Sequence, residues 1–394
     1  MTSTRQASRS EVLWALLEQG ISTREQLATA TKLSAATVSR VVDELMKEGL
    51  VRDAASIPTG RPGRRITPVE FVAHVGSVVG VDLGGTNCRV IAVDLLGKVL
   101  HRVRTAVPEG LSTRKLAGWL ADQVRSVANG ASLYSVTVGL PGIVHPATSE
   151  VRTATNLPQV EGLGFVKALR RQLEVPVGFD NDSNLALLGE MRLGAAQHHK
   201  SAVMFTIGTG LGAGVVLDGR LLRGRTGLIG EFGVYLPVGF DGLTLEDVLS
   251  ASGLVKEAAR AGVPVDSARE ILSGQPSKAL MGVRNRFEQA LFFALVGMTT
   301  AYEPEVIVLG GGVAESLGEI LPGIEQRLRA LIPECPALAI SKLGDPAGAV
   351  GALIVGLQDA YVQMGVNPSE LDVSVGPRLV ELLQSSEPGT EHVA

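Results

Sequence analysis

Residues 82–86, Asp-Leu-Gly-Gly-Thr, combine the residue types that hold phosphate groups. They stand between two apolar runs, residues 78–81 and 90–93, so the pattern predicts a strand, a tight turn and a second strand. Glycines let the backbone approach a ligand closely, and their N–H groups together with the Thr86 hydroxyl would form a cradle for phosphate oxygens. Asp82 could hold a metal-bound water or a Mg-nucleotide. For this motif alone, an ordinary glycine-rich hairpin is the alternative.

Two further glycine-rich segments favour the phosphate-binding interpretation. Residues 203–217 repeat the strand–turn–strand pattern, and residues 306–313 form an apolar strand that ends in three glycines. No Gly-Lys-Ser/Thr follows any of them, so none is a Walker loop, and the turn at 82–86 leads into a strand rather than the helix of a dinucleotide fingerprint. Together they resemble the sugar-kinase, hexokinase and actin group, in which two hairpins hold a nucleotide between related lobes. The predicted nucleotide-binding residues are Asp82, Gly84, Gly85, Thr86, Gly208, Thr209, Gly210, Gly212, Gly310, Gly311 and Gly312.

A third polar stretch follows the strand predicted at residues 175–180. It places Asn181 and Asp182 at the strand end, before a helix that begins near Ser183. In the sugar kinases that these segments resemble, an Asp at this place removes the proton from the attacking sugar hydroxyl, and the preceding Asn hydrogen bonds another hydroxyl. The alternative for Asp182 is a helix cap. The two roles are compatible.

The N-terminal part of the chain predicts a winged helix-turn-helix. Apolar spacing indicates helices at residues 9–19, about 24–30 and 35–48, with a Ser22–Glu25 capping box before the second. Two short strands would then enclose a loop at residues 59–65 that is rich in Gly and Arg. A helical docking module is the alternative.

The third of these helices has small and polar residues on its outer face, which suits entry into a DNA major groove. The Gly-Arg-Pro sequence of the loop resembles the core of an AT-hook, which binds the minor groove. Residues 1–70 contain ten Lys or Arg and eight Asp or Glu, a net charge of +2, against −4 for the whole chain. This modest charge favours a sequence-directed contact. The predicted DNA-binding residues are Ser34, Ala36, Thr37, Ser39, Arg40, Arg61, Arg64 and Arg65.

A winged helix joined to a two-lobed kinase body resembles the ROK family, which groups repressors, open reading frames and kinases. The resemblance covers nearly all of residues 8–363 and includes Gly139-Leu140-Pro141-Gly142. It implies an α/β fold, with an actin-like, sugar-kinase (RNase H-like) body behind the winged helix. Members with that domain are similar to regulators of carbohydrate genes, and members without it are mostly sugar kinases. The resemblance implies sugar contacts from Gly139, Pro141, Gly142, Asn156, Asn181, Asp182, Glu231 and Glu246.

The sequence departs from the family pattern in two places. The family's Glu-x-Gly-His run reads Glu231 to Val234 here, so the His is replaced, and the following stretch, residues 237–244, lacks the family's cysteines. Zinc requires thiolate and imidazole ligands, so we expect no zinc and no other bound metal. A sugar hydroxyl left unpaired would cost about 1–3 kcal/mol, so the pocket would suit a different sugar. Phosphorylation is disfavoured but stays open, because Asp182 and both hairpins are kept.

The amino-acid composition limits the architectures that the chain can adopt. The 45% hydrophobic content and the 47 glycines favour α/β lobes with large cores. The expected parts are a winged helix (1–70), a body (76–365) and a tail (366–394). Within the body, lobe 1 would comprise residues 76–182 and 347–364, and lobe 2 residues 183–346. The two cysteines form no framework, and we find no signal peptide and no apolar stretch of the ~20 residues that span a membrane, so we expect a cytoplasmic protein.

These features lead to one main hypothesis. The chain would be a DNA-binding transcriptional regulator of the repressor type, which senses a carbohydrate in a kinase-like cleft. Its partners would be double-stranded operator DNA and a carbohydrate effector, with no membrane partner and no cofactor required for DNA binding. A homodimer or a dimer of dimers would match a palindromic operator. The alternatives are an ATP-dependent sugar kinase that uses Mg-ATP with Asp182 as base and also binds DNA, and a regulator controlled by nucleotide.

Overall fold

The computed structural model describes residues 4–58 and 65–370. Its N-terminal domain consists of helices α1 (Thr4–Gln19), α2 (Arg24–Thr31) and α3 (Ala35–Lys47), followed by a wing. The first helix begins five residues earlier than the apolar spacing predicts. The capping box of α2 is formed by Thr23 and Gln26, and not by Ser22 and Glu25. The Ser22 hydroxyl instead donates to Gly20 O at 3.2 Å, and its backbone pairs with Val69 of the wing.

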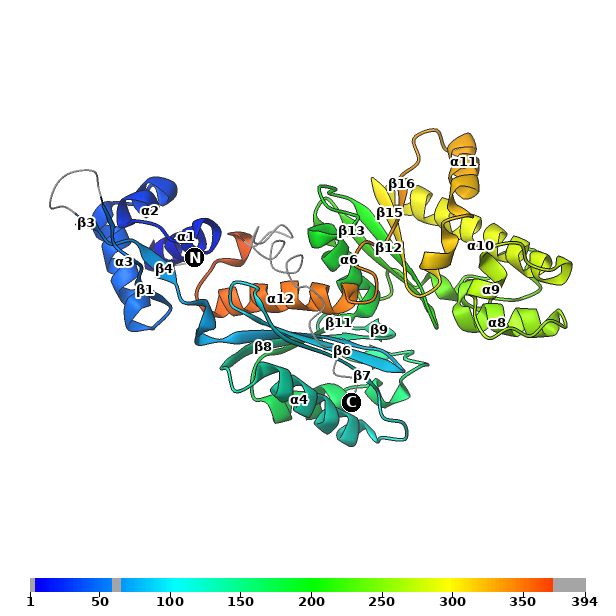
Figure 1. The fold of residues 1–394 in the computed structure, drawn as a ribbon, viewed down its shortest axis with the longest axis horizontal. Coiled ribbons are helices and arrows are strands. Elements are labelled where there is room, and N and C mark those ends of the chain that lie inside the picture. The colour runs from blue at the N-terminus through cyan, green and yellow to red at the C-terminus, as the bar shows by residue number, and fades with distance from the viewer. Residues whose placement is uncertain (1–3, 59–64, 371–394) are drawn as a thin grey trace.

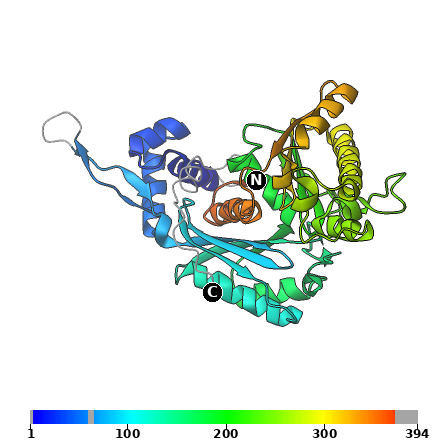
Figure 2. The same cartoon turned by 45° about the vertical axis from the view of Figure 1, so that its right-hand side comes forward.

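The wing consists of four short strands, β1 (Val51–Asp53), β2 (Ile57–Pro58), β3 (Arg65–Ile66) and β4 (Val69–Phe71). Strands β1 and β4 are antiparallel, with Val51 opposite Phe71, so residues 69–71 belong to the wing and not to the junction predicted at 69–76. Strands β2 and β3 continue the same hairpin. The wing extends away from the rest of the molecule (Figure 2).

The body contains two five-stranded sheets of matching topology, which confirms the prediction of two related α/β lobes. In lobe 1 the order is β11-β8-β5-β6-β7, with β6 antiparallel to both neighbours and β8 and β11 parallel to β5. The strands are β5 (Ser77–Leu83), β6 (Asn87–Asp94), β7 (Val99–Ala106), β8 (Leu133–Leu140) and β11 (Val177–Asn181). Helices α4 (Thr113–Ala128) and α5 (Gly164–Leu173) cover its outer face (Figure 1).

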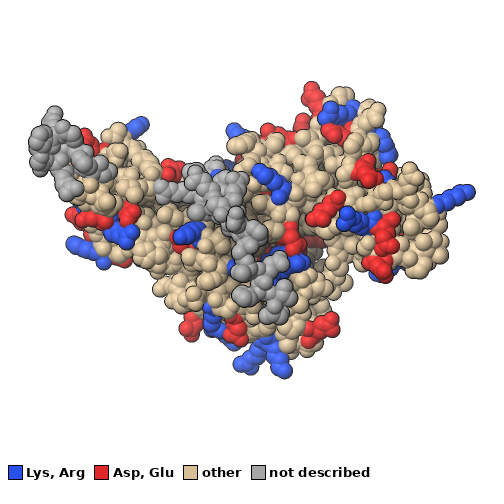
Figure 3. Space-filling model, in the orientation of Figure 1, with Lys and Arg blue, Asp and Glu red and all other residues tan. Residues whose placement is uncertain are grey.

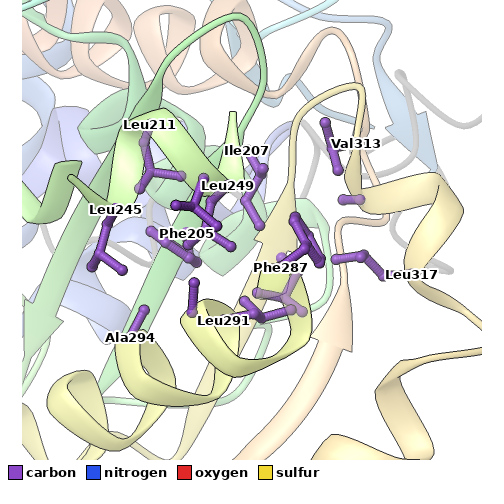
Figure 4. Packing of buried hydrophobic residues seen from close by; sticks show 14 of the residues in the cluster. Phe205, Ile207, Leu211, Leu245, Leu249, Phe287, Leu291, Ala294, Val313 and Leu317 are labelled. Atoms are coloured by element: carbon purple, nitrogen blue, oxygen red, sulfur yellow. The ribbon is translucent and has the colours of Figure 1, made fainter. Parts of the chain in front are cut away.

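Lobe 2 repeats this arrangement in the order β14-β13-β12-β15-β16. Its strands are β12 (Ala202–Ile207), β13 (Leu211–Leu217), β14 (Arg220–Leu221), β15 (Val306–Gly310) and β16 (Ala337–Ile340). Helix α10 (Lys278–Tyr302) packs against them, and Phe287 and Leu291 of that helix belong to the same core cluster as Phe205 and Leu211 of the sheet (Figure 4). The remaining elements are β9 (Ile143–Val144), β10 (Val151–Arg152), α7 (Leu245–Leu249), α8 (Ala251–Arg260), α9 (Arg269–Leu272), α11 (Leu321–Leu331) and the short 3-10 helices η1 (Ala73–Val75), η2 (Pro158–Val160), η3 (Phe232–Val234), η4 (Ala314–Leu317) and η5 (Pro368–Glu370).

Helices α6 (Asp182–Leu193) and α12 (Ala347–Gln363) cross between the two sheets (Figure 1). They meet backbone to backbone, because a Cβ at Gly351 would collide with Leu185 O and one at Gly189 would lie 2.6 Å from Ala347 O. Glycine is therefore required at this crossing.

The body continues past the limit predicted at residue 365. Val366 is buried, and the N–H of Asn367 donates to Ser10 Oγ at 2.7 Å, so these two residues are not part of a loosely held tail. Residues 371–394 of the predicted tail lie outside the described residues. No helix in residues 4–58 and 65–370 is both long and apolar enough to cross a bilayer.

Candidate ligand cleft and DNA-binding surface

The residues predicted to act on a sugar lie where β11 ends and α6 begins. Asn181 is the N-cap of α6, and its Oδ1 accepts hydrogen bonds from the N–H groups of Ser183 at 2.9 Å and Asn184 at 3.1 Å. Its Nδ2 donates to Gly142 O at 3.0 Å, which ties the cap to the Gly-Leu-Pro-Gly loop. The first N–H groups of a helix need such partners. The capping role considered for Asp182 is thus performed by Asn181.

Asp182 is the first residue of α6 and is half-buried. Its Oδ1 accepts hydrogen bonds from Ser183 N at 2.7 Å and Ser183 Oγ at 3.3 Å, while its Oδ2 has no hydrogen-bond partner among the described residues. Burial raises the pKa of the Asp182 carboxyl from 3.8 to about 6, and the nearby Glu231 adds to the increase. A carboxylate with a pKa close to neutral is suited to accept a proton from a hydroxyl.

Two more carboxylates from lobe 2 extend this cluster. Burial raises the pKa of Glu231 from 4.5 to about 7, and Glu246 contributes as a second negative charge. Glu246 lies in α7, and its Oε2 accepts a hydrogen bond from Leu211 N at 3.1 Å, where the second glycine hairpin enters β13. Ionised carboxylates only accept hydrogen bonds. Asp182, Glu231 and Glu246 together therefore suit a ligand rich in hydroxyl donors.

Asn156 connects this cluster to the glycine hairpins. A Cβ at Gly85 would collide with Asn156 O, and one at Gly210 would lie 3.5 Å from Asn156 Nδ2 and 3.3 Å from Glu246 Oε2. Gly85 and Gly210 therefore permit a close approach of the backbone to other chain segments. The structure thus brings a predicted sugar residue and the turns of both predicted phosphate hairpins into one site.

The glycines of the predicted phosphate cradle fall into two groups. Gly212 serves packing, because a Cβ there would lie 2.5 Å from Ser183 Oγ, and Gly310 packs against Met204. At Gly208 and Gly312 nothing lies within 4 Å of the Cβ position, so these faces are open.

The polar groups of the hairpins also fall into two sets, those that close the turns and those that are exposed. The N–H groups of Gly84 and Gly208 close their own turns, with Asn87 O and Gly210 O as acceptors, both at 3.0 Å. The other predicted contacts are exposed: Thr86, Thr209, Gly311 and Gly312. Open backbone and exposed hydroxyls fit the phosphates of a nucleotide.

Asp82, predicted to hold a Mg-nucleotide, is engaged by Arg89 across the β5–β6 pair. Arg89 Nη1 lies 3.3 Å from Asp82 Oδ2, and Arg89 Nε donates to Asp345 Oδ2 at 2.8 Å. Burial raises the pKa of Asp82 to about 7, with Asp182 adding to the increase and Arg89 opposing it. A cation bound at Asp82 would have to compete with Arg89. Because Asp82 and Arg89 are directly opposite in a predicted hairpin, the sequence contained the signal for this pair.

Two buried carboxylates that support the site were missed by sequence reasoning. Asp180 Oδ2 accepts a hydrogen bond from Arg223 Nε at 2.8 Å, which joins the residue before Asn181 to the segment after β14. Glu190 is fully buried and accepts four hydrogen bonds, one from Ala195 N just after α6 and three from the loop before α12. No spacing rule connects Asp180 with Arg223, because their contact arises only from the tertiary fold.

In the segment where the resemblance implies a zinc loop for the family, buried Phe240 alternates with exposed residues. Val234, at the place of the family's His, is 61% exposed, and Val238 is fully exposed. Val234 therefore offers no hydrogen bond and does not line an enclosed pocket. Among the described residues, no group of three or more His, Cys, Asp or Glu side chains could hold a metal ion.

The predicted DNA-contact face lies on α3. Ser34 is its N-cap and accepts a hydrogen bond from Thr37 N at 3.1 Å, while Ala36 is exposed and Ser39 half-buried. Arg40 is exposed, but its Nη1 lies 3.0 Å from Glu44 Oε1. Small side chains on this face fit the proposal that the helix enters a DNA groove.

Acidic partners reduce the positive charge of this face. Glu44 is shared between Arg40 and Arg5, whose Nη2 lies 2.8 Å from Glu44 Oε1. Arg61, Arg64 and the side chain of Arg65 lie outside the described residues. Acidic and basic side chains are interspersed over the face of the molecule in Figure 3.

Comparisons with known proteins agree with this geometry. Residues 78–358 match the family model described as "ROK family", and residues 6–52 match one described as "Winged helix-turn-helix DNA-binding". The chain is 25% identical to the xylose repressor of Caldicellulosiruptor bescii, over 91% of this chain and 97% of that protein. It is 31% identical to the glucokinase of Thermotoga maritima, over 70% of this chain and 95% of that protein.

A solved structure supports the same fold. It is a ROK-family transcriptional regulator described as a homologue of E. coli MLC, with a TM-score of 0.74 and 22% identity, covering 96% of this chain and 99% of that one. The repressor-like relatives extend over the winged helix, whereas the glucokinase matches only about the length of the body. The chain therefore belongs to the ROK family and has the winged-helix organisation of its transcriptional regulators.

Proposed function

We propose that this protein is a transcriptional regulator of the repressor type that binds operator DNA through α3 and the wing and binds a carbohydrate in the cleft between its lobes. The observation that carries the proposal is the convergence of the Asp182, Glu231 and Glu246 carboxylates, in a body whose core continues into the winged helix. The carboxylates accept hydroxyl hydrogen bonds, and the shared core provides a physical route to the DNA-binding helix. Repressor-like relatives support the DNA-binding half of the proposal.

The experiment measures operator affinity with and without sugar. A DNA site is selected from a random-sequence library with the full-length protein, and its dissociation constant is measured by fluorescence anisotropy in D-xylose, D-glucose or a matched sugar alcohol. We expect one sugar to change the DNA dissociation constant by about fivefold or more, in the usual range of allosteric coupling. Glu246→Gln should remove the sugar response and keep DNA binding. Arg40→Ala should weaken DNA binding and keep sugar binding. A DNA affinity that no sugar alters would refute the sensing half.

A sugar kinase that also binds DNA is the second candidate, because Asp182 retains the position and pKa of a general base and the Thr86 and Thr209 hydroxyls are exposed. Release of ADP from Mg-ATP in the presence of D-glucose or D-xylose, abolished by Asp182→Asn, would establish this activity. Asp247→Asn, which alters a carboxylate in the α7 capping box, is the matched control. No ADP above the Asp182→Asn background would exclude turnover of these two sugars.

A further inference from the structure

One arginine of the winged-helix domain contacts the body and α3, the recognition helix of the proposed DNA contact, at the same time. Arg9 Nε donates to Met364 O, the C-cap carbonyl of α12, at 3.0 Å. Its Nη1 and Nη2 donate to the two carboxylate oxygens of Glu48, the C-cap of α3, at 2.8 and 2.6 Å. The Arg9 side chain is only 19% exposed. A single guanidinium therefore joins the end of α12 to the end of α3.

The surroundings of Arg9 hold this contact in place. Ser10 is buried and accepts the hydrogen bond from Asn367 N. Gly365 has a φ of +102°, and a Cβ there would lie 2.8 Å from Arg9 Nε, so only glycine allows this approach. Val366 belongs to the same hydrophobic core as Val12 of α1. The winged helix is thus packed onto the end of α12.

The other end of α12 lies beside Asp82 of the candidate site. Its first turn contains Gly348, where a Cβ would be 3.1 Å from Asp82 Cγ. Asp345, just before the helix, pairs with Arg89 and thereby with Asp82. The helix has 17 residues and is about 25 Å long at 1.5 Å per residue. Figure 1 shows it running from beside α6 to beside α1. Packed helices are among the elements that can slide as rigid bodies in conformational changes.

We propose that α12 transmits changes at Asp82 and Asp345 to the recognition helix, and that Arg9 is the positioning residue at which the shift of α12 reaches α3. Displacement of the first turn of α12 moves Met364 O, Arg9 follows it, and Glu48 carries the movement into α3. The proposal rests on the proposed function for its biological meaning. The competing interpretation is that Arg9 only stabilises the winged helix.

Arg9→Lys separates the two interpretations. A lysine ammonium can retain the ion pair with Glu48, but it lacks the planar fork needed to bond Met364 O and both oxygens of Glu48 together. Arg24→Lys is the matched control, because Arg24 pairs with Asp43 of the same recognition helix at 3.3 Å, entirely within the winged helix. Both variants should retain helix content and thermal unfolding close to those of the wild type.

The test is a double-mutant cycle between the two ends of α12. Asp345→Asn is introduced into the wild-type, Arg9→Lys and Arg24→Lys backgrounds, and the dissociation constant for the selected DNA is measured in each. Distant substitutions normally have additive effects. We expect Asp345→Asn to change the DNA dissociation constant by about fivefold or more in the wild-type and Arg24→Lys backgrounds, and by less than about twofold in Arg9→Lys. Equal effects in all three backgrounds would overturn the proposal.

A second readout needs neither DNA nor a sugar. The chain has two tryptophans, Trp14 in α1 and Trp119 in α4, so Trp119→Phe leaves Trp14 as a single reporter beside this junction. Asp345→Asn should shift Trp14 emission, and Arg9→Lys should abolish that shift. If sugars leave DNA affinity unchanged but Trp14 still responds through Arg9, the sensing function fails and the connection stands. If Trp14 emission is the same with and without Asp345→Asn, the connection fails by itself.

Discussion

Replacing Asp182 by asparagine should stabilise the protein while it removes the proposed ligand chemistry. Burial raises the pKa of the Asp182 carboxyl from 3.8 to about 6, so the folded state disfavours the ionised form. A pKa difference of this size corresponds to roughly 3 kcal/mol. Because Asp182 keeps some contact with solvent, we expect about 1–2 kcal/mol of this to be realised. Asparagine can still accept the Ser183 hydrogen bonds through its own Oδ1.

The sign of the pH dependence follows from the direction of the shift. Since the folded-state pKa lies above the unfolded value, wild-type stability falls as the pH rises from about 4 to about 6, and the full penalty remains at higher pH. The stability gain of Asp182→Asn should therefore be largest near pH 8 and disappear near pH 4. Urea unfolding, followed by far-ultraviolet circular dichroism at both pH values, measures this difference.

Asp247→Asn is a control, because it should change the stability of the fold in the opposite direction to Asp182→Asn. Hydrogen bonds from Thr244 N at 2.9 Å and Thr244 Oγ1 at 2.7 Å lower the pKa of Asp247, so its ionised form stabilises the fold. That contribution is present above the unfolded-state pKa and is lost as the pH falls through the folded value. Asp247→Asn should thus cost stability near pH 8 and less near pH 4. The reasoning is refuted if Asp182→Asn is no more stable than the wild type near pH 8, or if its gain persists at pH 4.

Three further predictions concern packing, buried polar groups and DNA. Glu190→Gln places an amide NH₂ against buried N–H donors and should cost about 3 kcal/mol or more in urea unfolding, and a loss below about 1 kcal/mol would contradict the network. Gly212→Ala, whose Cβ would press on α6, should cost about 1–3 kcal/mol, whereas Gly208→Ala, with open space around it, should leave unfolding nearly unchanged. Glu44→Gln frees Arg40 and should strengthen DNA binding severalfold at low salt, whereas an unchanged affinity in a salt titration would exclude Arg40 from the contact.

Much of the fold was predictable because its signals are local. Apolar runs that end in glycine predicted the β5–β6 and β12–β13 hairpins, and the spacing of apolar residues predicted α3 to within one residue of its observed end at Lys47. Helix ends were less predictable, because the residue that caps a helix also depends on tertiary contacts of the residues around it. Ser22 carries a suitable side chain, but its pairing with Val69 moves the cap to Thr23.

The sequence indicated which residues are candidates for the site, but it did not indicate how they are arranged in space. Asp182, Glu231 and Glu246 were predicted as sugar contacts from the resemblance to the family, whereas their mutual influence on pKa depends on three segments that only the folded chain brings together. The Arg223–Asp180 pair and the Arg9–Met364 contact have no sequence signal, because each joins residues far apart in the chain. The carbonyl of Met364 is moreover a backbone acceptor, to which the identity of the residue contributes nothing.

At the crossing of α6 and α12, glycines of one helix face backbone carbonyls of the other, and substitutions there have different consequences from substitutions in the candidate site. Where the backbones touch, at Gly351 and Gly189, a side chain would collide with a carbonyl oxygen whatever ligand the candidate site holds. Val234 is 61% exposed and lies outside this contact, so a change of residue type there leaves the crossing intact. A body joined in this way can change its ligand-contacting residues and keep the contact between its lobes. That property agrees with the similarity of this chain to both a glucokinase and a xylose repressor.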